Sequence, residues 1–215
     1  MDRTKNAYEY LKNAILDGVI RQGEPLKEVE LAQNLQMSRS PIREALRQLE
    51  IEGIVTSYPG RGTFVAVITP YDVEEIYELR TIFELFALEK SFPRITDADL
   101  DRAEQSFLER NEPFNWEKYH DADRAFHQML VDKCGNRRAA TFLSILNNQV
   151  EWVRRCSARN AARSSSARLA EHLHIIECIR KRDLEASKEA LRTHLRNVSN
   201  AAMDTCRLMA TEQRS

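Results

Sequence analysis

The stretch SRSPIREALRQLEIEGIVTSYPGRGTFVAV, residues 38–67, changes its periodicity half-way along. In its first half, apolar residues recur at helical spacing, and arginines occupy a different stripe of the same helix. The apolar stripe is Ile42, Leu46 and Leu49, and the basic stripe is Arg39, Arg43 and Arg47. Ser38 stands at the N-cap position, and Pro41 suits the first turn. One face is therefore expected to pack while another presents a row of cations.

The second half of this stretch has the pattern of strands. After Gly53, residues 54–57 and 63–67 alternate in the manner of two strands, and the turn-forming residues 58–62 separate them. Arg61 lies between Gly60 and Gly62 at the centre of that turn. The pattern predicts a β-hairpin with an arginine at its tip.

Two further helices are predicted upstream. Tyr8, Leu11 and Ile15 mark an amphipathic helix that ends near Gly18, and residues 31–35 mark a short second helix. Only two residues separate that second helix from Ser38. Short helices joined so tightly form a helix-turn-helix, and the added hairpin makes it winged. The alternative is a solvated basic helix face, but the arginines and the hairpin together favour DNA binding.

Several short segments in this region resemble the GntR family of bacterial transcription regulators. They are Pro25-Leu26, Glu30-Leu31-Ala32, Ser38-Arg39-Ser40-Pro41-Ile42-Arg43-Glu44-Ala45-Leu46, Leu49, Glu52-Gly53 and Pro59-Gly60-Arg61-Gly62. The resemblance implies that Ser38, Arg39 and Arg43 contact DNA at the start of the recognition helix, and that Gly60 enters the minor groove. Val29 departs from the family, since an arginine contacts the operator there in its best-known member. The base preference therefore stays open, but the mode of binding does not.

The chemistry of arginine suits this role. Its guanidinium pairs bidentately with guanine O6 and N7, and a helix fits the major groove. Arg47, one turn further along, is better placed for a phosphate, and the glycines beside Arg61 allow close approach to a narrow groove. The predicted DNA-binding residues are Ser38, Arg39, Ser40, Arg43, Arg47, Gly60, Arg61 and Gly62.

The composition is that of an ordinary water-soluble protein. The chain has 215 residues, of which 42% are hydrophobic and 30% charged, with no run of membrane-spanning length and no signal peptide. We therefore expect a cytoplasmic protein. The net charge of −1 gives little general attraction to nucleic acid, so DNA binding must depend on local patterning. The four cysteines, Cys134, Cys156, Cys178 and Cys206, show no CxxC pairing and are expected to be buried free thiols.

The sequence after Thr69-Pro70 is predicted to be entirely helical. A mainly α protein is therefore expected, with a winged helix-turn-helix over residues 1–69 and an all-α six-helix bundle over residues 70–215. Breaks in the helical pattern include Glu112-Pro113 and residues 164–166. The predicted helices are 71–91, 97–110, 115–133, 137–158, 166–182 and 184–209.

All five histidines lie in the predicted bundle, and three of them can share one site with an aspartate. Asp123 and His127 are four residues apart on one helix face. His172 and His194 flank the Asp183 turn at similar distances, so an antiparallel pair brings them to similar depth. One carboxylate and three imidazoles suit a divalent zinc, nickel, manganese or iron ion. From these residues alone, partly buried histidines with ordinary hydrogen bonds are the favoured alternative.

A second resemblance favours the metal. The segments from Tyr71 to Arg80, Asp123-Arg124-Ala125-Phe126-His127 and Glu171-His172, with Ile176, Arg182-Asp183, Ala190 and His194, resemble the FCD effector domain of the FadR subfamily. Six helices indicate its VanR-like branch. The resemblance implies one divalent ion per subunit, held by Asp123, His127, His172 and His194. Glu171 is a candidate to support a ligand from behind. His120 and His174 are assigned to no ligand role.

Two functions follow from different classes. The first is a dimeric transcription repressor that grips an inverted repeat and releases it when a small organic acid binds the bundle. Arg80 is a candidate to anchor the carboxylate of that effector, although it could equally pair with Glu84 or Glu104. The second is a metal-dependent, hydrolase-like enzyme fused to a DNA-binding module. A bundle that only dimerises, with no ligand, is a third possibility.

Overall fold

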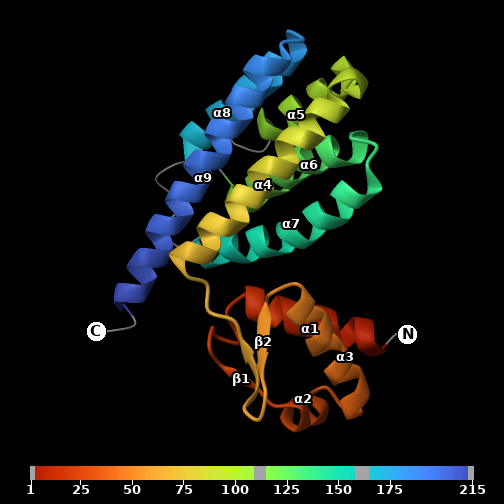
Figure 1. Cartoon of the computed structure of the whole chain (residues 1–215), viewed down its shortest axis with the longest axis vertical. Coiled ribbons are helices and arrows are strands. Elements are labelled where there is room, and N and C mark those ends of the chain that lie inside the picture. The colour runs from red at the N-terminus through yellow and green to blue at the C-terminus, as the bar shows by residue number, and fades with distance from the viewer. Residues whose placement is uncertain (1–2, 109–114, 158–164, 213–215) are drawn as a thin grey trace.

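The computed structural model describes residues 3–108, 115–157 and 165–212. The chain forms two parts, an N-terminal winged helix-turn-helix and a C-terminal helical bundle, which meet along one side of the bundle (Figure 1). The mainly α fold class predicted from the sequence is confirmed. None of the described helices is both long enough and apolar enough to cross a membrane.

The N-terminal part contains three helices and a small antiparallel sheet. The helices are α1 (Arg3–Leu16), α2 (Glu28–Asn34) and α3 (Arg39–Ile51), and the strands are β1 (Pro25–Leu26), β2 (Val55–Tyr58) and β3 (Gly62–Val65). The strand order is β1-β3-β2. The predicted hairpin is β2 and β3, which pair from Val55 opposite Val65 to Tyr58 opposite Gly62. The sequence did not predict β1, because a strand of two residues has no periodicity to detect.

Packing in this part follows the predicted apolar stripe. Ile42, Leu46 and Leu49 are buried on α3, while the arginines of the other stripe face solvent. Gln36 adopts a φ of 52° in the turn between α2 and α3. A buried carboxylate also joins two helices, since Glu52 accepts hydrogen bonds from Tyr8 and Lys12 of α1 at 2.6 Å and 3.0 Å. The end of α3 is therefore fixed to α1.

The bundle consists of six α-helices within the described residues. They are α4 (Pro70–Ser91), α5 (Asp97–Leu108), α6 (Trp116–Lys133), α7 (Arg137–Ser157), α8 (Ser165–Arg180) and α9 (Leu184–Glu212). Each agrees with a predicted helix to within a few residues. The predicted ends at residues 110 and 158, and the breaks at Glu112-Pro113 and Ser164, lie outside the described residues.

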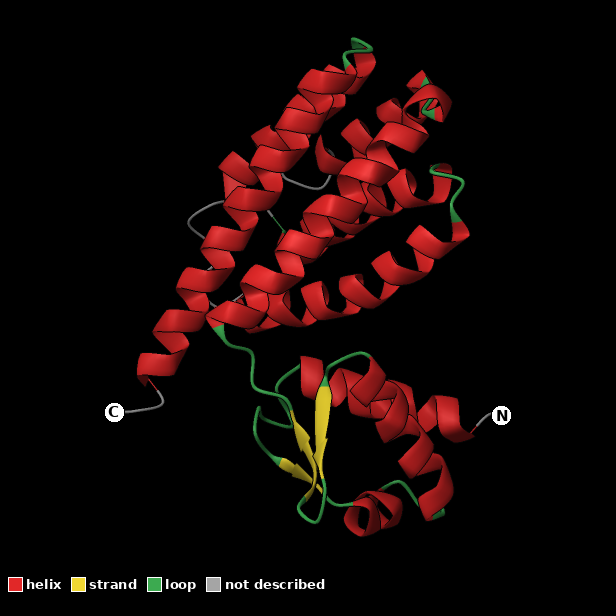
Figure 2. Cartoon of the chain, in the orientation of Figure 1, coloured by secondary structure: helices red, strands yellow, loops and turns green. Residues whose placement is uncertain are grey.

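The first bundle helix begins at a well-defined cap. Thr69 and Asp72 form a capping box, in which the Thr69 side chain accepts a hydrogen bond from the Asp72 N–H and the Asp72 carboxylate accepts one from the Thr69 N–H. Pro70 occupies the first helical position, where its missing N–H costs nothing. This explains why α4 starts directly after the connection to β3 (Figure 2).

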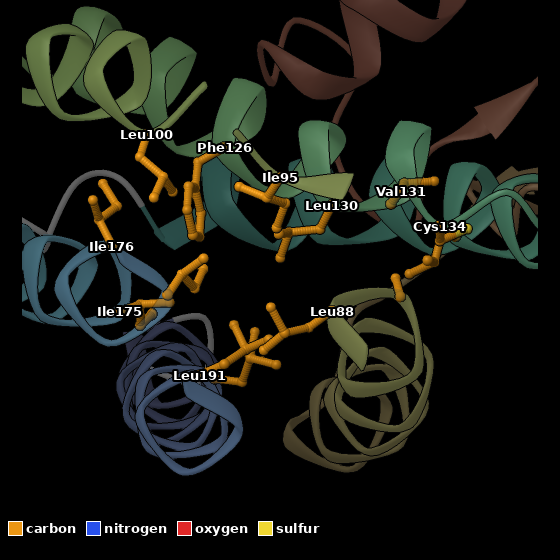
Figure 3. Close-up of a cluster of buried hydrophobic side chains, with 14 of the residues drawn as sticks. Leu88, Ile95, Leu100, Phe126, Leu130, Val131, Cys134, Ile175, Ile176 and Leu191 are labelled. Carbon is orange, nitrogen blue, oxygen red and sulfur yellow. The ribbon is translucent and has the colours of Figure 1, made fainter. Parts of the chain in front are cut away.

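The bundle core is made of aliphatic and aromatic side chains from most of its helices. Figure 3 shows Leu88, Phe126, Ile175 and Leu191, from four different helices, converging on one apolar cluster. Cys134 belongs to this core, and Cys178 and Cys206 are also buried; as predicted, none of the three forms a disulfide within the part of the chain that the structure describes. The side chain of Cys156 lies outside the described residues.

Helix α7 forms the contact between the two parts (Figure 1). The indole of Trp152 on α7 is only 3% exposed, because it packs into the hydrophobic core of the N-terminal part. Beside it, Arg155 Nη1 lies 2.5 Å from Asp17 Oδ1 at the end of α1. Most of α7 therefore packs within the bundle, while side chains near its C-terminal end contact the winged helix-turn-helix.

Candidate metal centre and nucleic-acid interface

The structure brings Asp123, His127, His172 and His194 together in the interior of the bundle. Asp123 and His127 come from α6, His172 from α8 and His194 from α9, and all four are buried. One possible ligand atom from each lies within 4.8 Å of the others. Asp123 Oδ1 is 3.1 Å from His172 Nε2, which is 3.5 Å from His127 Nε2. Adjacent ligands of one ion with bonds of about 2.1 Å lie about 3.0–3.4 Å apart.

Each histidine is held through the same ring nitrogen. Nδ1 of His127 lies 2.5 Å from Glu84 Oε2, Nδ1 of His194 lies 2.8 Å from Glu171 Oε2, and Nδ1 of His172 lies 2.9 Å from the carbonyl oxygen of Arg168. These three oxygens can only accept, so Nδ1 carries the proton in each ring. The Nε2 lone pair is then left for a ligand role in all three. Carboxylate and carbonyl groups support metal-binding histidines in the same way.

The carboxylate behind His127 belongs to a buried ion pair. Glu84 Oε1 accepts a 2.5 Å hydrogen bond from Arg80 Nε, and the two side chains are 1% and 4% exposed. Burial would raise the pKa of Glu84, but the positive charge of Arg80 and the hydrogen bonds from Arg80 and His127 lower it to about 2. Of the partners considered for Arg80, the structure therefore selects Glu84. Glu104 instead accepts from Arg180, at 2.7 Å.

The two carboxylate oxygens of Asp123 have different partners. Its Oδ1 points toward the histidines, and its Oδ2 accepts a short hydrogen bond from Arg154 Nη2 of α7. Burial would raise the pKa of Asp123, but Arg154 and the neighbouring histidines hold it well below its usual value. An ionised carboxylate and imidazoles with free Nε2 atoms are the donor set that a divalent transition metal prefers. The residues present therefore fit such an ion.

Aromatic side chains shield the group of Asp123, His127, His172 and His194, here called the ligand cluster, from solvent. Phe107 stacks on the ring of His172 with centroids 4.5 Å apart, and Phe126 meets it edge-on at 5.6 Å. The Tyr119 hydroxyl lies 3.1 Å from His172 Nδ1. Burial, together with the nearby His172, lowers the pKa of His194 to about 3, so this ring is neutral at physiological pH. The surroundings therefore preserve the metal-binding form of the His194 ring.

The two other histidines lie apart from the ligand cluster. His120 stacks on Trp116 with centroids 5.2 Å apart, and burial lowers its pKa to about 4. His174 lies 3.9 Å from the thiol of Cys178, on the other side of its helix from His172. Neither contributes to the group of four.

A chain of ion pairs leads from the ligand cluster to the N-terminal part. Arg154 pairs with Asp123 and, at 3.3 Å, with Glu151. The other oxygen of Glu151 accepts from Arg155 Nε at 2.8 Å, and Arg155 continues to Asp17. Three neighbouring side chains on α7 therefore connect a candidate metal ligand with α1. No spacing in the sequence indicates this connection, because it depends on how α6, α7 and α1 pack.

The predicted DNA-binding residues lie on one exposed element and one exposed turn. Ser38, Arg39, Ser40, Arg43 and Arg47 are exposed on or next to α3, and Gly60, Arg61 and Gly62 are exposed at the hairpin tip. Ser38 has the extended backbone of an N-cap residue, but its side chain makes no cap hydrogen bond. Gly60 and Gly62 have φ values of 74° and 95°, which explains the glycines on both sides of Arg61.

Comparison with known proteins agrees with this architecture. The family model of the bacterial regulatory proteins, gntR family, matches residues 3–65, and that of the FCD domain matches residues 75–197. The HTH-type transcriptional regulator YdhC of Bacillus subtilis is 31% identical over 192 residues, which cover 87% of this chain and 85% of YdhC. The chain belongs to the GntR family of bacterial regulatory proteins.

Other relatives support the same assignment for this GntR regulator. The HTH-type transcriptional repressor RspR of Escherichia coli is 27% identical over 197 residues, covering 90% of this chain and 86% of RspR. The crystal structure of a GntR regulator from Rhodococcus sp. RHA1 superposes with a TM-score of 0.77 at 26% identity, covering 95% of this chain and 99% of that one. The protein is therefore a transcriptional regulator with a DNA-binding GntR domain and an FCD effector domain. The alternative of a metal-dependent enzyme is set aside.

Proposed function

We propose that this regulator is a dimeric repressor whose operator binding is released by a small carboxylate bound at a metal centre in residues 70–215. One observation carries the proposal. Three buried histidines, each held through Nδ1, gather around one aspartate with a possible ligand atom of each within 4.8 Å of the others, and that aspartate is joined through α7 to the DNA-binding part. Because its partner is operator DNA, we place the protein in the bacterial cytoplasm.

The ion would be held by Asp123, His127, His172 and His194, with Glu84 and Glu171 orienting two of the imidazoles. Zinc, nickel, manganese and iron all accept this donor set. A bound divalent ion with open coordination positions supplies an attachment point for a carboxylate. The protein's own contribution is to keep the three imidazoles oriented and shielded from water.

Arg80 is proposed as a second anchor for the effector. Its Nε is occupied by Glu84, which leaves the Nη groups of the guanidinium to bind a carboxylate. A carboxylate near Arg80 would also lie close to Glu84, so the effector must supply enough contacts to offset that repulsion. This favours a small acid with hydroxyl or second carboxylate groups over a simple fatty acid.

The ion pairs of α7 are proposed to transmit effector binding to the DNA-binding part. Asp123 divides its two oxygens between the ligand cluster and Arg154, so a change at one oxygen alters the strength of the other contact. Arg154 and Arg155 share Glu151, and Arg155 holds Asp17. Trp152 packs into the core around α1 and α3, so a movement of α7 would displace side chains in that core. Coupling of this kind is reciprocal, typically about 1–3 kcal/mol.

An exposed apolar surface supports the proposed dimer. Leu79 and Ile82 on α4 and Phe142 on α7 are 47%, 63% and 55% exposed, and Phe142 stacks on Phe83 of α4. These side chains lie on two helices that pack against each other. Large apolar side chains gathered on neighbouring helices indicate a protein contact, and a second copy would place two recognition helices on an inverted repeat.

The test begins with duplexes selected from a random pool by the full-length protein. Fluorescence anisotropy with a selected duplex is then repeated in the presence of citrate, gluconate and single amino acids, with matched ionic strength. We expect a two-fold symmetric operator, a 2:1 protein-to-duplex ratio and weaker binding in the presence of at least one acid. Operator binding by monomers, or affinity unaffected by any carboxylate that calorimetry shows to bind, would contradict the proposal.

A further inference from the structure

The recognition helix carries an arginine that is already held in place by a glutamate from the preceding helix. Arg43 Nε donates to Glu28 Oε1 at 3.2 Å, and Arg43 Nη2 donates to Glu28 Oε2 at 2.9 Å. Glu28 is the first residue of α2, and Arg43 lies in the second turn of α3. Hydrogen bonding with Arg43 lowers the pKa of the Glu28 carboxyl.

The geometry of this pair leaves one edge of the guanidinium available. Arginine has five N–H donors in a planar fork, and the side-on contact with Glu28 uses the Nε–H and one of the two Nη2–H groups. The second Nη2–H and the Nη1–H groups form the other edge, which points away from the carboxylate. A parallel pair of N–H donors is what guanine O6 and N7 accept in the major groove. Glu28 and a guanine can therefore bind the same arginine at once.

We propose that Glu28 is a positioning residue for sequence recognition, which holds the Arg43 guanidinium in the plane and direction needed to read a guanine. The inference rests on the proposed function, because it requires that Arg43 faces a base. A long side chain exposed to solvent loses rotamer freedom when it binds, and a carboxylate that orders it beforehand removes that loss from the binding step. A carboxylate close to DNA also repels phosphates, so its net effect is to favour the cognate base over DNA in general.

A merely structural role for Glu28 makes a different prediction. Acidic residues in the first turn stabilise a helix through its dipole, and both Glu28 and Glu30 stand in the first turn of α2. Glu30 pairs with Lys27 at 2.8 Å rather than with an arginine of the recognition helix. It therefore has the same charge as Glu28 and stands in the same helical turn, without the contact to Arg43.

The experiment compares four variants of the full chain, E28A, E28Q, E30A and E30Q, on the selected operator, on operators changed at one guanine at a time, and on a scrambled duplex. R43A first identifies the base pair that Arg43 reads. We expect E28A to lower discrimination at that base pair by about two- to tenfold, the equivalent of ordering one long side chain on binding. E28Q, which keeps one acceptor, should fall between E28A and the wild type. Binding to the scrambled duplex should rise similarly in all four variants.

Three results would overturn the inference or its basis, and they can be told apart. If E28A and E30A both bind more tightly with unchanged discrimination, Glu28 acts only through its charge. If R43A keeps full discrimination at every base pair, Arg43 reads no base and Glu28 positions nothing, while the regulator function stands. If the wild type selects no duplex at all, the proposed function itself fails.

Discussion

The regulator contains the same chemical pair, an arginine and a glutamate, in two opposite settings. In the bundle, Arg80 and Glu84 are 4% and 1% exposed and stand directly behind a candidate metal ligand. On the proposed DNA-binding surface, Arg43 and Glu28 are 70% and 33% exposed. Breaking a buried pair leaves an uncompensated charge, whereas water replaces either partner of an exposed pair. The first pair therefore supports the fold and the ligand cluster, and the second can be devoted to recognition.

The proposed metal site and the proposed DNA-binding surface also differ in how they are built. The ligand cluster is built in advance, with every histidine fixed through Nδ1 and shielded by aromatic rings. The predicted DNA-binding residues are exposed, and among them Arg43 is the one that an ion pair to another described residue holds in place. A buried site selects its ligand by donor geometry, and an exposed one by charge and base edges.

The largest effect is expected from Glu84→Ala. The change leaves Arg80 buried without its partner and removes the acceptor that orients His127, so the free energy of unfolding should fall by roughly 3–5 kcal/mol. Metal affinity should fall by about 10–100-fold. Urea unfolding and competition with a chelator measure the two effects. Glu28→Ala is the matched control, and an equal loss of stability in that variant would remove the distinction between the two pairs.

Arg39→Ala tests the exposed surface. Arg39 begins the recognition helix and is exposed, so losing it should cost about 1–3 kcal/mol of discrimination at one base pair without affecting metal content. Arg47→Ala should instead weaken all sequences about equally and reduce the salt dependence. Competition gel shifts at two salt concentrations measure both. Full sequence preference in the Arg39 variant would show that another residue reads the base.

Gly60 at the hairpin tip can be compared with Gly18, which follows α1 and has a similar backbone conformation. Gly60 and Gly18 have φ values of 74° and 72°, and a β-carbon added at either residue would meet no neighbouring heavy atom within 4 Å. Valine at either position is therefore strained by about 1–2 kcal/mol for the same reason. Gly60→Val should impair operator binding while Gly18→Val should not, with similar falls in melting temperature. If the Gly60→Val and Gly18→Val proteins bind the operator equally well, the hairpin tip does not contact DNA.

The smallest effect is expected from Arg155→Ala. Its pairs with Asp17 and Glu151 are partly exposed, so stability should change little. The influence of effector on operator affinity should weaken by roughly 0.5–2 kcal/mol, with both separate affinities nearly preserved. Arg124→Ala, which breaks an exposed pair with Asp121 on α6, is the control. Unchanged coupling in the Arg155 variant would exclude the ion pairs of α7 as the route.

Spacing in the sequence was sufficient to predict the helices and the hairpin of β2 and β3, but not β1. The metal site was predicted from the resemblance to the FCD domain, because the residues alone favoured buried histidines with ordinary hydrogen bonds. Asp123 and His127 share a face through the helical repeat, and the turn at Asp183 brings His172 and His194 to one depth. The recognition helix and hairpin follow from a local change of period. Residues that act across helices could not be found in this way.

Glu84 and Trp152 illustrate what spacing alone does not reveal. Glu84 looks like one half of an i, i+4 pair with Arg80, and nothing in its spacing indicates that its other oxygen reaches His127. Trp152 stands between Val150 and Val153, which pack within the bundle, and nothing in its spacing indicates that it packs into the core of the N-terminal part. Both positions are set by the packing of helices distant in sequence.

The role of the metal centre is tested by comparing the wild type with a folded His172→Ala variant, using a carboxylate that releases the wild-type protein from its operator. Elemental analysis, calorimetry and operator anisotropy are measured on the same preparations. We expect His172→Ala to lose the metal and the effector response together while keeping operator affinity, because the DNA-binding surface is separate from the ligand cluster. A folded, metal-free variant that still releases the operator fully on adding the acid would contradict the sensing role proposed for this site.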